Sequence, residues 1–127
     1  MKYAYPAILA PKGDGTYLVT VPDLPGCLTE GDGLAEALDM CADAMAMWLW
    51  SAESKGEPVP APTEQSVQSP EFVSYVAADT DEYRKQHDAR AVKKTLTIPA
   101  WLNAKAEAAN APFSQILQEG LKDYLSL

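Results

Sequence analysis

Alternating apolar and polar positions predict a small antiparallel sheet in the N-terminal part of the chain. Residues 1–10 predict a strand with Tyr3, Tyr5 and Ile8 as apolar anchors. Residues 16–21 have the period of two that is typical of a strand, and β-branched residues are frequent in them. The turn between them contains Asp14-Gly15, a pair that favours a tight hairpin. Residues 27–30 predict a short third strand and residues 71–77 a fourth.

A helix is predicted between the third and fourth strands. Apolar residues recur there at spacings of three and four, from residue 34 to about residue 54. Asp32 precedes this segment and is expected to cap its first turn. The stripe expected to face the sheet consists of Leu34, Leu38, Cys41, Met45, Trp48 and Leu49. Residues 45–50 are apolar all round, which fits either burial on more than one side or a contact with another protein.

Two polar segments lie on either side of the fourth strand. Residues 57–70 hold four prolines among Gln, Ser and Glu, and they predict an extended, exposed loop. Residues 79–91 are rich in charge and predict a linker or a short helix. The chain is therefore expected to divide into a domain over residues 1–78, this linker, and a second domain over residues 92–127.

The second domain has the pattern of one strand followed by two helices. Residues 93–98 alternate like a strand, and Pro99 stands where a proline often begins a helix. The first helix is expected to end near Asn110, which can adopt the left-handed conformation that stops a helix. A second helix is expected from residue 112 or 113 to about residue 125, because apolar residues again recur at helical spacing.

The charge of the chain changes sign at the expected linker. Residues 1–82 carry 14 acidic and 3 basic side chains, a net charge of −11, whereas residues 83–127 carry 4 acidic and 7 basic ones, a net charge of +3. An acidic domain repels nucleic acid and suits a basic partner protein. If the chain binds DNA, the basic C-terminal part must make the contact.

Composition argues against several other classes of protein. No apolar run has the roughly 20 residues that a membrane-spanning helix needs, and the first residues lack the pattern of a secretory signal. We therefore expect a cytoplasmic protein without membrane contact. The two cysteines and one histidine have no metal-ligand spacing, so neither a metal nor another cofactor is expected. Cys27 and Cys41 are expected to be ordinary buried residues.

The strand of the second domain cannot be stable in a single copy. It would have two unpaired edges, and roughly 35 residues are too few to build an adequate core. In a homodimer the two strands pair as an antiparallel ribbon and the helices pack beneath it. The residues expected to hold this dimer together are Leu96, Ile98, Leu102, Ile116, Leu117 and Leu121. Further pairing through the N-terminal domain would give a tetramer.

Such a ribbon fits the major groove of DNA. Lys93, Thr95 and Thr97 would point away from the helices towards base edges, while the start of the second helix would hold a phosphate. The residues expected to bind DNA are Lys93, Lys94, Thr95, Thr97, Phe113 and Ser114. The alternative is a dimeric scaffold that binds no DNA.

Two groups of residues follow the pattern of a known family. The first comprises Tyr5-Pro6-Ala7, Asp14-Gly15, Tyr17 with Val19, Val21-Pro22-Asp23-Leu24-Pro25-Gly26-Cys27, Thr29-Glu30-Gly31-Asp32 and Ala35-Glu36-Ala37-Leu38. The second comprises Lys93-Lys94-Thr95-Leu96-Thr97-Ile98-Pro99, Leu102 and Phe113-Ser114-Gln115-Ile116-Leu117-Gln118-Glu119-Gly120-Leu121. Through both groups the chain resembles HicB-type antitoxins, which join a HicB domain to a ribbon-helix-helix domain. Pro112 and Gly120 depart from this pattern, which usually has a polar capping residue and an alanine at these two places.

The resemblance implies an α+β fold, in which a truncated ribonuclease-H-like β-β-β-α-β domain precedes a ribbon-helix-helix domain of one strand and two helices. It implies an antitoxin, not an enzyme. The acidic domain would cover a HicA-type toxin, a small basic protein that cleaves messenger RNA, and the tail would repress the shared operon by binding double-stranded operator DNA. The residues expected to bind the toxin are Asp23, Leu24, Pro25, Glu30 and Asp32.

A ribonuclease-H-like fold also raises a Mg²⁺-dependent nuclease as an alternative, since such an enzyme needs several converging carboxylates. The candidates are Asp14, Asp23, Glu30 and Asp32. Asp14 is expected in a hairpin turn and Asp32 at a helix cap, so both have structural roles. No strand centre carries an acidic residue, and we therefore expect no catalytic residues.

Overall fold

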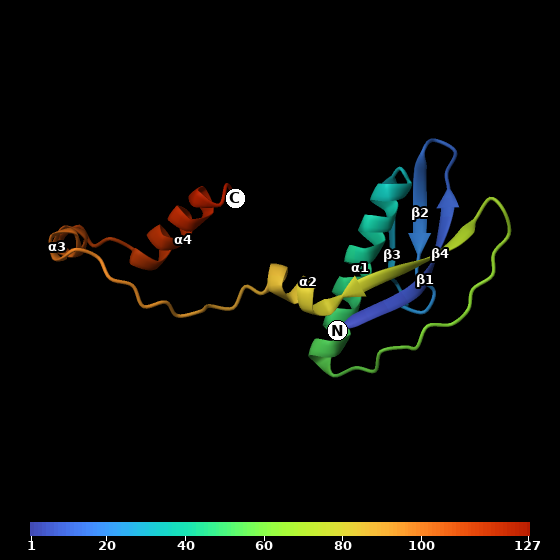
Figure 1. The fold of residues 1–127 in the computed structure, drawn as a ribbon, viewed down its shortest axis with the longest axis horizontal. Coiled ribbons are helices and arrows are strands. Elements are labelled where there is room, and N and C mark those ends of the chain that lie inside the picture. Colours follow the sequence, from blue (N-terminus) through green and yellow to red (C-terminus); the bar gives the residue numbers. More distant parts are fainter. The chain divides into compact units, whose positions relative to one another are not determined.

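Four strands and two helices make up the first part of the chain. They are β1 (Lys2–Pro11), β2 (Thr16–Thr20), β3 (Leu28–Asp32), α1 (Leu34–Lys55), β4 (Phe72–Asp79) and α2 (Thr80–His87). Two further helices, α3 (Ala100–Ala108) and α4 (Phe113–Tyr124), follow (Figure 1). The computed structural model describes residues 1–127, which divide into a first unit of residues 1–89 and a second unit of residues 90–127. The predicted order of three strands, a helix and a fourth strand is confirmed.

The strands form one antiparallel sheet in the order β3-β2-β1-β4. Strand β1 pairs with β4 along residues 2–9, but it pairs with β2 only along residues 8–11. Pro6 has no N–H to donate, and it lies where β1 has a neighbour on one side only. The observed strands differ from the predicted ones by one or two residues at their ends.

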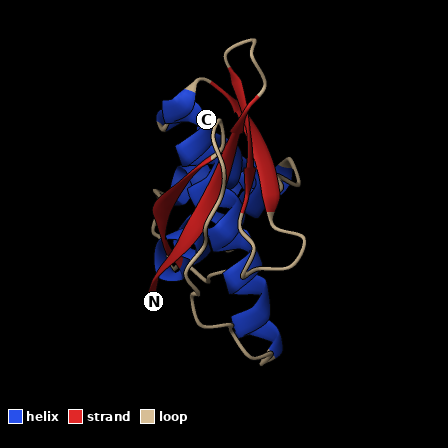
Figure 2. Cartoon of the chain, turned by 90° about the vertical axis from the view of Figure 1, so that its right-hand side faces the viewer, coloured by secondary structure: helices blue, strands red, loops and turns tan.

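Helix α1 covers one face of this sheet (Figures 1 and 2). The buried core lies between them and contains Tyr5, Ala7, Leu9, Val19, Val21, Leu24, Cys41, Met45, Leu49 and Val76. In β1 the core residues are Tyr5, Ala7 and Leu9, which alternate along the strand. Of the three predicted anchors only Tyr5 is buried, whereas Tyr3 and Ile8 are only partly buried. From α1, the central part of the predicted stripe enters the core, because Cys41, Met45 and Leu49 are all buried.

The first turns of α1 lie closer to β3 than the apolar pattern indicates. A Cβ atom on Gly31 would stand 2.4 Å from the backbone N of Ala37, so only glycine fits at this place in β3. Ala37 is completely buried, whereas Leu34, which was predicted to face the sheet, is 42% exposed. The prediction for Leu34 is wrong because a small residue, not the nearest large one, occupies the closest approach between helix and sheet.

Helix α1 begins at the predicted residue, but its cap differs from the prediction. Asp32 does not cap the helix, since it is the last residue of β3 and the N-cap is Gly33. Gly33 has a φ of 92°, which favours glycine, and no side chain caps the helix. Instead, the carboxylate of Glu36 in the first turn accepts a hydrogen bond from the backbone N–H of Asp32.

Residues 57–70 form the predicted extended loop, and this loop crosses the sheet on the side opposite α1 (Figures 1 and 2). Two sets of hydrogen bonds hold it. The hydroxyl of Tyr5 donates to the carbonyl of Pro60, and the backbone N–H and hydroxyl of Thr63 both donate to the carboxylate of Asp23. Val59 packs against the core. The loop is therefore attached to the sheet although it has no regular structure of its own.

The segment that was predicted as a linker or a short helix contains α2. The side chain of Asp79 caps this helix by accepting from the N–H of Asp81. Tyr83 packs against α1, with its ring centroid 5.5 Å from that of Trp50, and it stacks on His87. Helix α2 thus belongs to the first unit, and the unstructured connection is residues 88–99.

The second unit contains the two predicted helices. Helix α3 ends at Ala108, and Asn110 then adopts a φ of 53°, as its left-handed role predicted. Residues 93–98, however, are not a strand in the single chain. A strand exists through hydrogen bonds to a neighbour, and the predicted neighbour is the same segment of a second copy. Because only one chain is present, the ribbon formed by two copies stays a prediction.

Candidate functional site

The second unit has no buried core of its own. None of residues 90–127 is buried, and α3 and α4 contain no buried residue. The six residues predicted to hold a dimer are all exposed: Leu96 65%, Ile98 47%, Leu102 41%, Ile116 51%, Leu117 37% and Leu121 52%. Apolar residues in this number need a covering surface, because an exposed apolar patch of this kind marks an interaction site.

The residues predicted to bind DNA lie at two places in this unit. Lys93, Thr95 and Thr97 are exposed along the connection, and none of them lines a pocket described below. Lys94, Phe113 and Ser114 come together with the predicted dimer residues. They line one cavity of about 510 Å³, which is also lined by Leu96, Ile98, Asn103, Ile116 and Leu117. This is the division that the alternation of residues 93–98 predicted, with Lys94 on the same side as the two apolar residues.

Helix α4 begins without a side-chain cap. Its N-cap is Pro112, which has no side-chain group to accept from the first turn. The first-turn N–H groups are therefore left for solvent or a ligand, since the first hydrogen bond of the helix runs from the N–H of Ile116 to the carbonyl of Pro112. The nearby Lys105 lies over the ring of Trp101, 5.8 Å from its centroid, on its own helix.

Two of the residues predicted to bind a toxin lie in the turn between β2 and β3 and interact with other parts of the chain. Leu24 is completely buried, so its side chain belongs to the core and is not available to another protein. Asp23 holds the loop through Thr63, and its charge adds to burial in raising the pKa of the Tyr5 hydroxyl. Pro25 remains exposed, and its carbonyl accepts a hydrogen bond of 2.9 Å from the ring N–H of Trp48.

The other two predicted toxin residues lie on β3. Glu30 forms an ion pair with Lys12 across the sheet edge, and this hydrogen bond raises the pKa of the lysine. Asp32 is exposed at the end of the strand. The structure therefore keeps Pro25, Glu30 and Asp32 at the surface, while it gives Leu24 a structural role.

The carboxylates of the nuclease alternative do not converge. Asp14 accepts hydrogen bonds from the N–H and hydroxyl of Thr16, which lower the pKa of its carboxyl group. Asp23 and Glu30 have the partners described above. No group of three or more metal-ligating side chains is found in residues 1–127. Asp14, Asp23 and Glu30 thus each have a partner within the chain.

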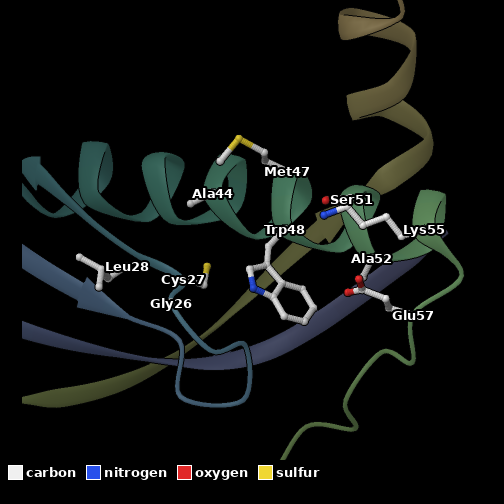
Figure 3. Close-up of a pocket in the computed structure, with 10 residues that line it drawn as sticks. All are labelled: Gly26, Cys27, Leu28, Ala44, Met47, Trp48, Ser51, Ala52, Lys55 and Glu57. Carbon is white, nitrogen blue, oxygen red and sulfur yellow. The ribbon is translucent and has the colours of Figure 1, made fainter.

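Sequence reasoning missed a groove between α1 and the start of β3, here called the α1–β3 groove. Its cavity measures about 450 Å³ and is lined by Gly26, Cys27, Leu28, Ala44, Met47, Trp48, Ser51, Ala52, Lys55 and Glu57 (Figure 3). Trp48 points from α1 towards the loop that carries Gly26 and Cys27 (Figure 3). Leu28 and Met47 remain 62% and 55% exposed.

A signal for this groove was present in residues 45–50, which are apolar all round. Of these residues, Met45, Ala46 and Leu49 are buried, whereas Met47 is exposed. The core interpretation is therefore confirmed for one side of the helix, whereas the contact with another protein stays a prediction for the exposed side. The spacing of residues alone did not reveal that the turn before β3 forms the opposite wall.

The two cysteines are free and buried, as predicted. Burial raises the pKa of the Cys41 thiol to about 12, and it also raises the pKa of Cys27. A thiolate is the reactive form of cysteine, so burial disfavours the reactive form of both side chains. The helices of the structure include none that is both long and apolar enough to cross a bilayer.

Comparison with known proteins assigns the family. The model of a HicB-like antitoxin of bacterial toxin-antitoxin systems matches residues 5–117. A 14.9 kDa protein from the rep-hol intergenic region of Haemophilus phage HP1 is 32% identical over 100 residues, which cover 77% of this chain and 74% of that protein. Antitoxin HicB 1 of Photorhabdus laumondii is 40% identical over 63 residues, which cover 48% of this chain but only 41% of the relative.

A solved structure agrees with these sequence matches. A chain of a toxin-antitoxin complex from Streptococcus pneumoniae superimposes with a TM-score of 0.62 at 27% identity, and the match covers 98% of this chain and 99% of that one. The mixed sheet-and-helix fold and the sequence thus define one class of protein, the antitoxins of toxin-antitoxin systems. Within that class, the chain belongs to the HicB-like family. The relatives whose names state a function are antitoxins, which agrees with the expectation of an antitoxin and not an enzyme.

Proposed function

We propose that this chain neutralises a basic, messenger-RNA-cleaving toxin of the HicA type by direct binding, and that it represses its own operon as a DNA-binding dimer. One observation carries the proposal: an acidic unit with a complete core is joined to a basic unit without one. Residues 1–89 carry 15 acidic and 5 basic side chains, a net charge of −10, and they contain every buried core residue. Residues 90–127 have a net charge of +2 and exposed apolar residues.

The lack of a core supports dimerisation through the second unit as a ribbon-helix-helix domain. Two copies of residues 93–98 would satisfy each other's backbone groups, and the exposed leucines and isoleucines would form a shared core. Lys93, Thr95 and Thr97 would then stand on the outer face of the ribbon, towards base edges, with Lys94 and the uncapped start of α4 beside phosphates. Pairing of the first units would convert such a dimer into a tetramer.

The acidic surface of the first unit supports toxin binding. A basic toxin that acts on RNA presents positive charge where RNA binds, and a domain of net charge −10 attracts that surface and competes with RNA for it. Pro25, Glu30 and Asp32 are the predicted contact residues that remain exposed. Asp23 would act by holding the loop, and Leu24 by filling the core. The finer prediction of a truncated ribonuclease-H-like sheet stays a prediction; in the observed sheet every neighbouring pair is antiparallel.

We predict that the reading frame next to that of this chain encodes a small basic protein, and the test is growth of cells that express it. We expect expression of that protein to stop growth, and co-expression of the full chain or of residues 1–89 to restore it. Residues 90–127 should not restore growth, but the full chain should retard a DNA fragment from upstream of its own reading frame in a gel-shift assay. If residues 90–127 alone restore growth, our assignment of neutralisation to the first unit is wrong. No gel shift would favour a dimeric scaffold.

A further inference from the structure

We infer that the toxin docks in the α1–β3 groove, and that it inserts an amphipathic helix whose apolar anchors are flanked by lysines or arginines. This inference rests on the proposed function. It names the surface of this chain that contacts the toxin and the kind of toxin segment that binds there. The groove has three properties that a docking site needs: apolar residues that no other part of the chain covers, a shape that admits a helix, and acidic side chains along one border, although Lys55 lines its far end.

The apolar residues lie on one flank of α1 and on the strand beside it. Met40 and Met47 are 43% and 55% exposed. Leu28 on β3, which lines the same cavity as Met47, is 62% exposed. Two methionines suit a docking surface because their flexible side chains adapt to the partner. Trp48 also lines the groove, and its ring N–H donates a hydrogen bond to the carbonyl of Pro25. A partner can therefore exclude water from the groove without leaving this donor unpaired.

The shape of this flank suits a helix. Met40, Ala44, Met47 and Ser51 follow one another at spacings of four, three and four residues, which places them in a row along α1. Large and small side chains alternate in this row. The row therefore offers ridges and gaps into which the side chains of a second helix can fit.

Acidic side chains border the row. Glu36, Asp39 and Asp43 are exposed at spacings of three and four residues, and α1 has no basic residue before Lys55. Asp39 and Asp43 have no ion-pair partner in the chain. A second copy of this chain would bring the same charges into contact, which is unfavourable, whereas lysines or arginines on a toxin would neutralise them. The charge therefore favours a basic partner over self-association.

The other exposed apolar surfaces of the molecule are less suitable. The sheet face opposite α1 is crossed by residues 57–70 (Figure 2). The apolar residues of the second unit are needed for its own dimer. Tyr75 on β4 is 64% exposed, but it lies on the edge strand farthest from β3 and lines neither of the cavities described above.

The experiment measures binding of the full chain to the small basic protein encoded next to it, which is separated from the complex by denaturation and refolded. Met47→Lys combined with Leu28→Lys places positive charge in the groove on residues that are already exposed. We expect this variant to weaken binding by roughly tenfold or more, mainly through faster dissociation. Asp39→Lys combined with Asp43→Lys should slow association and weaken its dependence on salt.

Two control variants match these substitutions outside the groove. Tyr75→Lys changes an apolar residue of similar exposure, and Glu64→Lys combined with Glu71→Lys reverses two exposed acids. Both controls should bind like the unsubstituted chain, and all variants should keep its thermal unfolding temperature and its operator gel shift. If the groove variants bind as tightly as the unsubstituted chain, the α1–β3 groove is not the docking site, but the proposed function stands. If the unsubstituted chain does not bind, both fail.

Discussion

Gly31 illustrates how one residue sets the distance between two elements. The β3 backbone at this position lies so close to α1 that an added Cβ would overlap the backbone of Ala37. The atoms that it would meet belong to the helix backbone and cannot move aside as a flexible side chain does. The close approach brings Ala37 into the core and orients the whole flank of α1 that borders the groove.

We therefore expect Gly31→Ala to destabilise the first unit by about 1–3 kcal/mol, as overpacking of a rigid contact does. The free energy of unfolding from urea denaturation, followed by tryptophan fluorescence, measures the change. Gly120→Ala is the control, because a Cβ there meets nothing within 4 Å. In the middle of α4 that change should favour the helix by up to about 1 kcal/mol. Equal stability of Gly31→Ala and the unsubstituted chain would contradict the close contact.

The acidic residues show what sequence reasoning cannot separate at this scale. Asp14 and Asp23 are of the same type and lie in similar turns, yet one closes its own hairpin and the other holds a loop from 40 residues further along the chain. Local sequence predicts the first role, since Asp-Gly is a turn signal. The second depends on where Thr63 lies in space, which no local pattern contains.

Among the elements, those with a strong period were predicted well. The four strands, α1, α3 and α4 were found within a few residues of their predicted ends, since alternation and helical spacing record which side of an element is buried. The cap of α1 and the exposure of Leu34 were not predicted, because they depend on the approach of β3. The α1–β3 groove was missed for the same reason: its walls come from segments that only the fold brings together.

Residues 93–98 are an element whose structure depends on a second chain. If they form a ribbon with their outer face in the major groove, Thr95→Ala combined with Thr97→Ala should abolish operator binding while leaving the dimer intact. Gel shift measures the first effect, and molar mass from light scattering measures the second. The comparison variant is Leu96→Asp with Ile98→Asp, on the inner face, which should lose both the dimer and operator binding. Undiminished operator affinity of the threonine variant would contradict readout by the ribbon.

At the scale of the whole molecule, the two units should differ in how they unfold. The first unit has its own buried core, so its stability should not depend on protein concentration. The second unit has no buried residue in a single chain, and its folded state should therefore be linked to association. We expect calorimetry of the full chain to show two transitions, of which only one moves to higher temperature as the protein concentration is raised.

The identity of the two transitions can be established with variants. Residues 1–89 alone should show only the concentration-independent transition, because they contain every buried core residue. Leu117→Asp with Leu121→Asp, which places charge on the apolar face of α4, should remove the concentration-dependent transition and leave the other one unchanged. If both transitions of the full chain move together with concentration, the first unit also folds through association. Toxin binding and DNA binding would then belong to one cooperative assembly rather than to two independent units.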